Sequence, residues 1–241
     1  MYTATMSLKK SIALASFLSY SAFAIEPTIV LDPGHGGKVD SGTTVAKIHE
    51  DEINYDIAVR VHEILSKNKF KSHITVIDLS STTPQQRLKN DSDESLNYAT
   101  GPLPMDKRYI DKRCELINSF GEQSILVSIH NNYLSKSYRG ACIYHPRHPE
   151  SIRLATSIAK AMKKNGLKLY TFRGKSLPSI LANPNYVVLQ TTLEAKVLVE
   201  CTNLANSADR KIILNSKMRQ KYAQAIAEGV QEYRTQRINA Y

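Results

Sequence analysis

Apolar and polar positions follow two different periods along this chain. Short continuous apolar runs, which are typical of buried strands, fall at residues 28–31, 74–79, 125–129, 141–144 and 196–199. Between these runs, apolar residues recur every three or four positions, which is the spacing of one helix face. These segments predict helices that begin near Glu50, that cover 106–119 and 150–165, and that pass through Tyr222 and Tyr233.

This alternation predicts an α/β fold, an open and mainly parallel twisted sheet of about five or six strands flanked by helices. No internal repeat and no Pro/Gly-rich linker divides the chain after its first residues. Residues 80–105 carry turn-forming residues and no apolar period. We therefore expect a long loop there, either a functional rim or a mobile insertion.

The first 24 residues have the pattern of a secretory signal. Lys9 and Lys10 provide a positive start, residues 12–18 provide a short apolar centre, and the small-x-small motif AFA ends at Ala24. The apolar stretch is shorter than the ~20 residues that a spanning helix needs. We expect cleavage after Ala24, which leaves residues 25–241 as one domain of a periplasmic or secreted protein without a membrane span.

The net charge limits the expected binding partners, and the number of cysteines limits the possible disulfide bonds. The formal net charge is +10, and residues 1–24 contribute two lysines and no acidic residue to it. A basic exported protein is expected to be drawn to anionic envelope polymers or headgroups. No nucleic-acid-binding motif occurs, so nucleic acid is not an expected partner. Three cysteines allow at most one disulfide bond, and three buried thiols are the favoured interpretation.

Polar residues with metal or acid–base chemistry follow three of the predicted strands. His35 lies in LDPGHGG after the first strand, His130 in SIHNN after the third, and Glu200 in VLVECTN after the last. Ligands of open α/β sheets bind beyond the carboxyl ends of the strands. Glu50 opens the helix that follows the first strand and projects toward the same rim. Two histidines and a carboxylate suit a zinc ion with one open position, and another carboxylate nearby suits a general base.

These motifs resemble those of the zinc-dependent N-acetylmuramoyl-L-alanine amidases, an exported family that cuts stem peptides from the glycan strands of peptidoglycan. LDPGHGG, EDEINYDIA, SIHNN and VLVECTNLAN match four family motifs in order, over about residues 28–233. The resemblance implies that His35, Glu50 and His130 bind one zinc ion and that Glu200 is catalytic. It implies a catalytic domain over 25–241, peptidoglycan as the substrate, and a monomer; it leaves a protein activator open.

The chain also departs from the family pattern. Thr202 and Asn203 stand where the family usually has Gly-Phe, and Ala195 stands where proline is common. These changes could reshape the substrate groove but leave the four chemical positions filled. Arg139 could hold a carboxylate of a stem peptide, although we favour a structural role for it.

Other functions are compatible with parts of this pattern. A zinc peptidase or carboxypeptidase acting on another bond of wall peptides would use the same metal set. A non-catalytic wall-binding module is a different class, against which the complete ligand set argues. A thiol amidase with Cys201 as the nucleophile lacks a histidine placed to serve as its base. His145 and His148, in HPRH, are not included in the predicted site.

Overall fold

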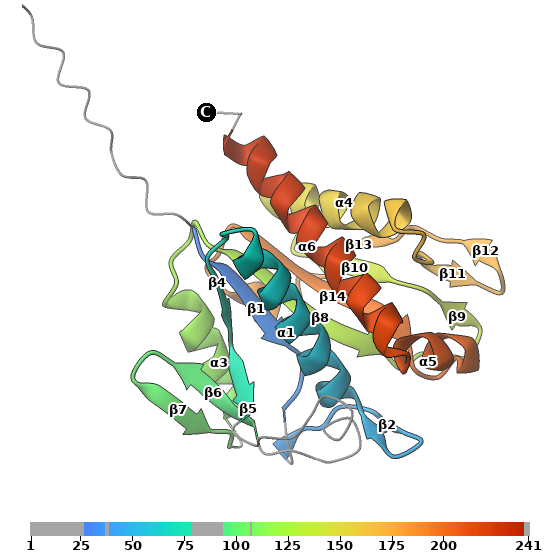
Figure 1. Cartoon of the computed structure of the whole chain (residues 1–241), viewed down its shortest axis with the longest axis horizontal. Coiled ribbons are helices and arrows are strands. Elements are labelled where there is room, and N and C mark those ends of the chain that lie inside the picture. The colour runs from blue at the N-terminus through green and yellow to red at the C-terminus, as the bar shows by residue number, and fades with distance from the viewer. Residues whose placement is uncertain (1–26, 37–38, 79–93, 107, 239–241) are drawn as a thin grey trace, which may run out of the picture.

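A computed structural model describes residues 27–36, 39–78, 94–106 and 108–238. Its centre is a six-stranded sheet with the strand order β13-β10-β14-β8-β1-β4 (Figure 1). In chain order the strands are β1 (Ile29–Pro33), β4 (Ser72–Ile74), β8 (Ile125–Asn132), β10 (Cys142–His145), β13 (Ile180–Ala182) and β14 (Ala195–Asn203).

The sheet is mainly parallel, which confirms the predicted fold class. β14, β8, β1 and β4 run in the same direction. β10 is antiparallel to β14, and β13 is parallel to β10. The carboxyl ends of β1, β8 and β14 therefore meet at one rim of the sheet.

Three helices cover one face of this sheet. They are α1 (Glu50–Lys67), α4 (Pro149–Lys164) and α6 (Ser216–Ile238), and they cross the near side of the strands in Figure 1. Alternate strand residues point toward them, including Leu31, Val127 and Val199, which are fully buried. These side chains pack against helix residues such as Ile57 and Ile226 to form the larger core. The burial of this apolar face is what holds the helical layer to the sheet.

The opposite face has a thinner cover. It consists of α3 (Tyr109–Asn118) and the short 3-10 helix η2 (Val187–Gln190). Ile117 of α3 and Val188 of η2 pack with Val30, Leu126 and Leu198 of the sheet in a second apolar cluster. The polar residues His130 and Glu200 lie on this same face, because they keep the alternation of Leu126 and Leu198.

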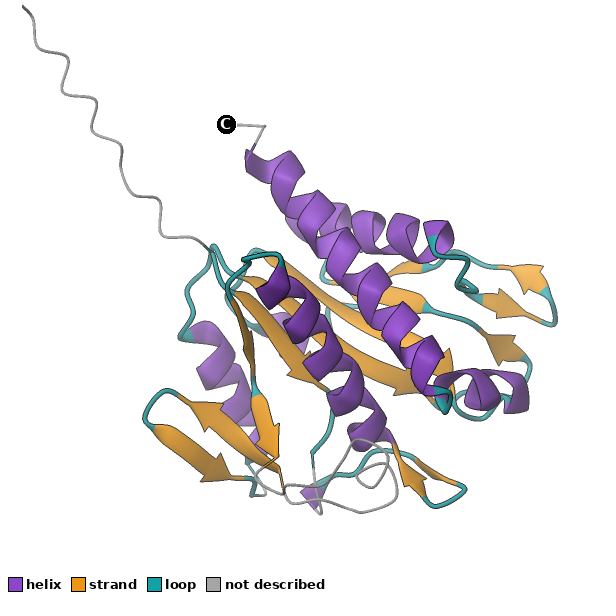
Figure 2. Ribbon diagram, viewed as in Figure 1, coloured by secondary structure: helices purple, strands orange, loops and turns teal. Residues whose placement is uncertain are grey.

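Small elements surround the main sheet, as Figure 2 shows. They are the pair β2 (Thr44–Val45) and β3 (Ile48–His49), the sheet of β5 (Val76–Asp78), β6 (Glu94–Tyr98) and β7 (Gly101–Pro104), the sheet of β9 (Tyr138–Arg139), β11 (Thr171–Phe172) and β12 (Lys175–Ser176), and helix α5 (Ser207–Ile213). Short pieces such as these lack a long periodic pattern, so the sequence predicted none of them as a separate element, although β5 falls within the predicted run 74–79.

Two predictions need correction. The run 74–79 is not one strand: β4 belongs to the main sheet, and after Thr75 the chain turns into β5 of a separate small sheet. The expected loop 80–105 contains the hairpin of β6 and β7 over its later part. Residues 79–93 lie outside the described residues.

Several remaining predictions bear on the chain ends and the cysteines. Residues 1–24 lie outside the described part of the chain, so the signal peptide and its cleavage stay predictions. Within the described residues, no helix combines the length and apolarity needed to span a membrane. All three cysteines are free thiols; Cys142 and Cys201 are buried, as predicted, whereas Cys114 is only half-buried.

Candidate metal centre

The loop after β1 presents His35 at the rim of the sheet. His35 itself has a left-handed backbone with φ of 66°. Neither Gly34 nor Gly36 has a positive φ. The close approach of neighbouring side chains is what requires glycine at these two positions. A Cβ on Gly34 would lie 2.1 Å from the His130 ring, and one on Gly36 would lie 2.3 Å from the Met105 sulfur.

A buried arginine of α3 holds this loop in place. Arg113 Nη1 donates a hydrogen bond of 2.9 Å to the Pro33 carbonyl, and Nη2 donates to the carbonyl of His35. Its guanidinium also lies 3.5 Å from Asp32, which is buried and accepts hydrogen bonds from Thr75 and Ser128. Arg113 thus offsets the strain of the left-handed histidine through direct contacts to the backbone.

Glu50 is the first residue of α1 and is only 4% exposed. Its Oε2 accepts a hydrogen bond from the Thr43 amide, and its Oε1 accepts one from the Asn131 amide, each 3.1 Å long. The amino end of a helix favours a negative charge. Burial by itself would raise the pKa of Glu50, but the hydrogen bonds and charges of His130 and His35 lower it below the ordinary range.

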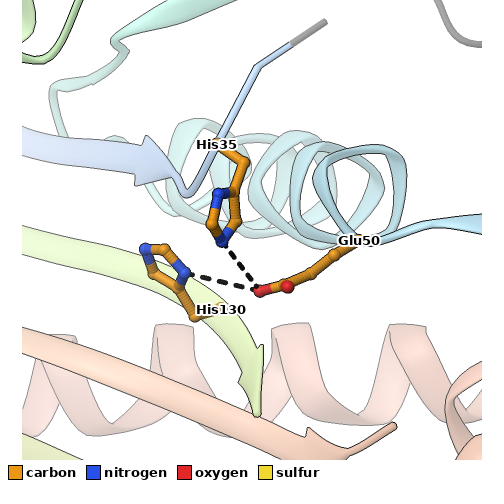
Figure 3. Close-up of side chains that lie close together, drawn as sticks. All are labelled: His35, Glu50 and His130. Atoms are coloured by element: carbon orange, nitrogen blue, oxygen red, sulfur yellow. Dashed lines mark ion pairs between the residues drawn. The ribbon is translucent and has the colours of Figure 1, made fainter. Parts of the chain in front are cut away.

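The structure brings His35, Glu50 and His130 into one cluster, shown in Figure 3. Glu50 Oε1 lies 3.3 Å from His35 Nε2 and 3.5 Å from His130 Nδ1. Ligand atoms bound to zinc at ~2.0–2.1 Å in a tetrahedron lie about 3.3 Å apart. Two imidazoles and a carboxylate are typical zinc ligands, and their separation here fits a single ion.

A carboxylate that the sequence analysis missed orients His35. Asp40 Oδ2 lies 2.9 Å from His35 Nδ1, and Asp40 also accepts hydrogen bonds from the Tyr109 hydroxyl and the Gly42 amide. Burial lowers the pKa of His35, but the hydrogen bonds and charges of Glu50 and Asp40 outweigh this effect and raise it to about 9. A carboxylate on the far nitrogen of a metal-binding histidine fixes the ring and its tautomer. The only sign of this contact in the sequence was an acidic residue, Asp40, five positions after His35. Nothing in the sequence indicated the contribution of Tyr109.

Glu200 lies beside the cluster without joining it. It pairs in register with His130 on β8 and is 6% exposed. Its Oε2 has no hydrogen-bond partner among the described residues. Burial raises the pKa of Glu200 well above the ordinary range, and the charge of Glu50 raises it further. A buried carboxylate without a partner is costly, so this position points to a group outside the chain.

A cavity of about 350 Å³ opens between these residues and the thin cover of the sheet. His35, Glu50, His130 and Glu200 line its polar side. Tyr186, Val188 and Leu198 line its apolar side. The cavity can hold a ligand that presents a polar group to the cluster and an apolar part to η2.

Two of the residues that depart from the family pattern, Thr202 and Asn203, have structural roles. Thr202 Oγ1 donates a hydrogen bond of 2.7 Å to Asn131, whose own amide donates to Asn54. Asn203 Nδ2 donates to the carbonyls of Ser135 and Tyr138. These side chains therefore brace the backbone behind Glu50 and the loop after β8.

Arg139 and two histidines outside the predicted site, His62 and His73, have local partners. Arg139 forms an ion pair of 3.0 Å with the buried Asp209, consistent with the structural role that we favoured. His62 contacts Ser72 and His73 contacts the Asn97 carbonyl; both are half-buried. His145 is buried and lies outside the metal-binding cluster of the described residues.

The fold and the cluster define an α/β protein with a candidate metal centre at the carboxyl ends of its parallel strands. A family model described as N-acetylmuramoyl-L-alanine amidase matches residues 29–232. The chain belongs to this family, which confirms the resemblance seen in its motifs.

Named relatives support the same assignment. A probable cell wall amidase, LytH, of Staphylococcus epidermidis is 29% identical over 209 residues, covering 86% of this chain and 58% of the relative. An uncharacterized cell wall amidase of Bacillus anthracis is 26% identical over 224 residues, covering 86% of this chain and 35% of the relative. The chain thus spans between about a third and three fifths of the length of these relatives.

Solved structures show the same fold. The apo N-acetylmuramyl-L-alanine amidase of Mycobacterium abscessus has a TM-score of 0.66 at 22% identity, covering 86% of this chain and 98% of the other. The CwlD amidase of Clostridioides difficile, solved in complex with the GerS lipoprotein, has a TM-score of 0.65 at 22% identity, covering 87% and 98%.

Proposed function

We propose that this protein is an exported zinc hydrolase that cleaves the amide bond between the lactyl group of N-acetylmuramic acid and L-alanine in peptidoglycan. The observation that carries the proposal is the pairing of a three-ligand cluster with a buried, unpartnered carboxylate on one cavity. Membership of the amidase family supports the choice of bond and of polymer. The basic charge of the chain suits an anionic wall polymer.

His35, Glu50 and His130 would hold one zinc ion. Such an ion, when bound, polarises a carbonyl and lowers the pKa of water from ~15.7 to ~7. Glu50 contributes the negative charge of the ligand set, and the amides of Thr43 and Asn131 hold its two oxygens in place. Asp40 keeps the His35 ring oriented with Nε2 toward Glu50.

Glu200 is the proposed general base. Its Oε2 is free to accept the proton of the attacking water, because no group of the described residues occupies it. Burial gives this carboxylate a raised pKa, so it holds the proton long enough to pass it to the leaving amine of L-alanine. The apolar wall of Tyr186, Val188 and Leu198 offers a contact surface to the apolar part of the substrate beside the reacting amide.

Export and the peptidoglycan partner belong to the same proposal. Removal of residues 1–24 would place the mature chain in the periplasm or outside the cell, where its substrate lies. CwlD was solved with a lipoprotein partner; for this chain an activating partner remains an open part of the proposal. We expect the mature enzyme to act as a monomer.

The deciding experiment is mass spectrometry of the products released from purified peptidoglycan by the mature protein. We expect free stem peptides that begin at L-alanine beside glycan strands without peptides. A peptidase or carboxypeptidase would release shorter peptides and leave the muramyl amide intact. A wall-binding module would release nothing. Either result would overturn the proposal, provided that zinc content has been verified on the same sample.

A further inference from the structure

Charge is distributed unevenly along this chain. Residues 123–193 contain ten lysines and arginines and a single acidic residue, Glu150. This segment runs from β8 to η2 and builds one side of the molecule, including α4 and the β9–β11–β12 sheet. A field of one sign on one side of a protein attracts and orients ligands of the opposite sign.

A small antiparallel sheet of this segment projects to the right of β10 and β13 in Figure 1. We call it, with its flanking loops, the basic arm: β9, β11 and β12 with the exposed cations Lys136, Lys168, Arg173 and Lys175. Phe172 pairs with Tyr138 on one side and with Lys175 on the other. Directly paired residues share one face of a sheet, so these three side chains lie together.

Stacked rings make the basic arm rigid. The Tyr138 ring stacks on Tyr170 with centroids 5.5 Å apart and planes 12° apart, and it lies 4.7 Å from the Phe172 ring. The Arg173 guanidinium lies over Phe172, 5.2 Å from its centroid. Contacts of both kinds favour one arrangement of the side chains over many. The cations of the arm are therefore presented on a fixed base.

The turn at the tip of the basic arm holds an arginine in a left-handed backbone conformation. Arg173 and Gly174 join β11 to β12 and have φ of 47° and 80°. A two-residue hairpin loop with two positive φ values favours asparagine or glycine at its first position. An arginine there stores strain of order 1 kcal/mol, and such strain clusters at functional positions.

The basic arm is coupled to the proposed active site through β14. Asn203, three residues after Glu200, donates hydrogen bonds to the Ser135 and Tyr138 carbonyls of the arm's first strand and its loop. Asp209 accepts from Arg139 and from the Gly140 amide. The loop to the arm begins with Asn132 and Tyr133, which line the cavity. The segment that lines the cavity thus continues along the chain into the first strand of the arm.

The four exposed cations of the basic arm have no ion pair with any described residue. Some cations elsewhere on the surface are neutralised within the chain, whereas others, such as Lys67 and Lys71, have no ion pair with a described residue. Arg60 pairs with Asp56, Lys164 with Glu228, and Arg237 with Glu194. The charge of the arm is thus available to an external anion.

We propose that the basic arm binds carboxylate groups of the stem peptides on the polymer whose amide bond enters the cavity. This inference rests on the proposed function, because it assigns the polymer. The arm would contact peptides next to the one being cleaved, since it lies beyond the cavity along β14 and β9. Polymeric peptidoglycan would therefore bind more tightly than a single short fragment, because only the polymer reaches the cations of the arm.

The test is sedimentation of the full mature protein with insoluble peptidoglycan from which attached phosphate polymers have been removed. The variant is Arg173→Glu with Lys175→Glu. The matched control is Lys67→Glu with Lys71→Glu, two exposed lysines at the end of α1 and just before β4, the edge strand on the other side of the sheet. Both pairs change the net charge equally. Zinc content and the thermal midpoint verify that each variant is folded and loaded.

We expect the arm variant to bind about 10-fold more weakly at 50 mM salt, with the difference shrinking at 500 mM as charges are screened. The control should bind within about twofold of wild type, as exposed charges outside a contact contribute little. Peptidoglycan whose carboxylates have been converted to amides should bind the wild-type protein and the arm variant equally weakly.

Three results would overturn the proposal. The first is an equal loss in the arm and control variants, which would reflect net charge alone. The second is a loss of binding by the arm variant that occurs only with peptidoglycan that retains phosphate polymers. The third is a loss of binding by the arm variant that occurs only with anionic phospholipid vesicles. Failure of the proposed function is separate: arm-dependent binding without release of any stem peptide would refute the hydrolase and leave the arm as a binding surface.

Discussion

Two buried glutamates on one cavity have opposite electrostatic environments. Glu50 accepts two backbone hydrogen bonds and faces two imidazoles, which lower its pKa. Glu200 is equally buried, but one of its oxygens has no hydrogen-bond partner among the described residues and its pKa is raised. The residue type is the same and the exposure is nearly the same. The surrounding donors make the difference.

This difference separates the proposed roles. A carboxylate that stays ionised among histidines suits a metal ligand, whereas a carboxylate that takes up a proton readily suits a general base. Paired titratable groups whose environments push their pKa values apart are typical of acid–base sites. Four predictions test this division, starting with the largest expected effect.

Removal of a ligand should abolish metal binding. We expect His35→Ala or His130→Ala to weaken zinc binding by on the order of 10²–10³-fold, because four-ligand zinc sites bind with ~10–16 kcal/mol in total, or roughly 2.5–4 kcal/mol for each ligand. Metal analysis after dialysis measures this. His49→Ala is the control, since His49 precedes Glu50 but contacts Thr44. Full zinc occupancy in both alanine variants would refute the proposed cluster.

Removal of the base should leave the metal in place. Glu200→Gln is nearly isosteric but cannot accept a proton, so peptidoglycan hydrolysis should fall by ~10²–10⁴-fold at unchanged zinc content. Both quantities are measured on one preparation. Glu194→Gln, at an exposed residue that pairs with Arg237, should behave like wild type. If Glu200→Gln loses its zinc, Glu200 is a ligand and Glu50 must be reassigned.

Loss of the orienting carboxylate should have an intermediate effect. Asp40→Asn keeps the shape but weakens the hold on His35, and such substitutions typically reduce metal affinity by ~10–100-fold. Competition with a chromogenic chelator measures the affinity. Asp106→Asn, which removes an exposed ion pair with Lys112, is the matched control. Unchanged affinity in Asp40→Asn would show that the contact with His35 has no role in metal binding.

The smallest effect concerns stability of the metal-free protein. Because the folded state raises the pKa of Glu200 above its ordinary value of 4.5, the folded state binds more protons there than the unfolded state. Stability from this group is complete below pH ~4.5 and falls as pH rises toward the raised value, by at most ~1.4 kcal/mol per pH unit.

Glu200→Gln lacks this titration. In the presence of a chelator, its melting temperature should exceed that of wild type at pH 7 and approach it at pH 4. Thermal unfolding across this range measures the difference. A constant difference between the two proteins at all pH values would show that Glu200 titrates as it does in water.

The sequence predicted the parts of the site that follow from local order. A strand that ends in a polar residue places that residue at the rim of a parallel sheet, so the positions of His35, His130 and Glu200 could be anticipated. Glu50 could be anticipated because it opens a helix next to the same rim. The α/β class followed from two alternating periods, since buried strands and amphipathic helices differ in the spacing of their apolar residues.

The tertiary structure decided what depends on contacts between distant segments. Arg113 and Tyr109 act on the His35 loop through contacts that span 80 and 69 residues of the chain, and no local pattern marks them. The run 74–79 was divided between two sheets by pairing with Leu31 on one side and Leu96 on the other. The opposite environments of Glu50 and Glu200 have the same origin. Sequence fixes which side chains reach the rim, but only packing decides which donors surround each carboxylate, and those donors determine its charge.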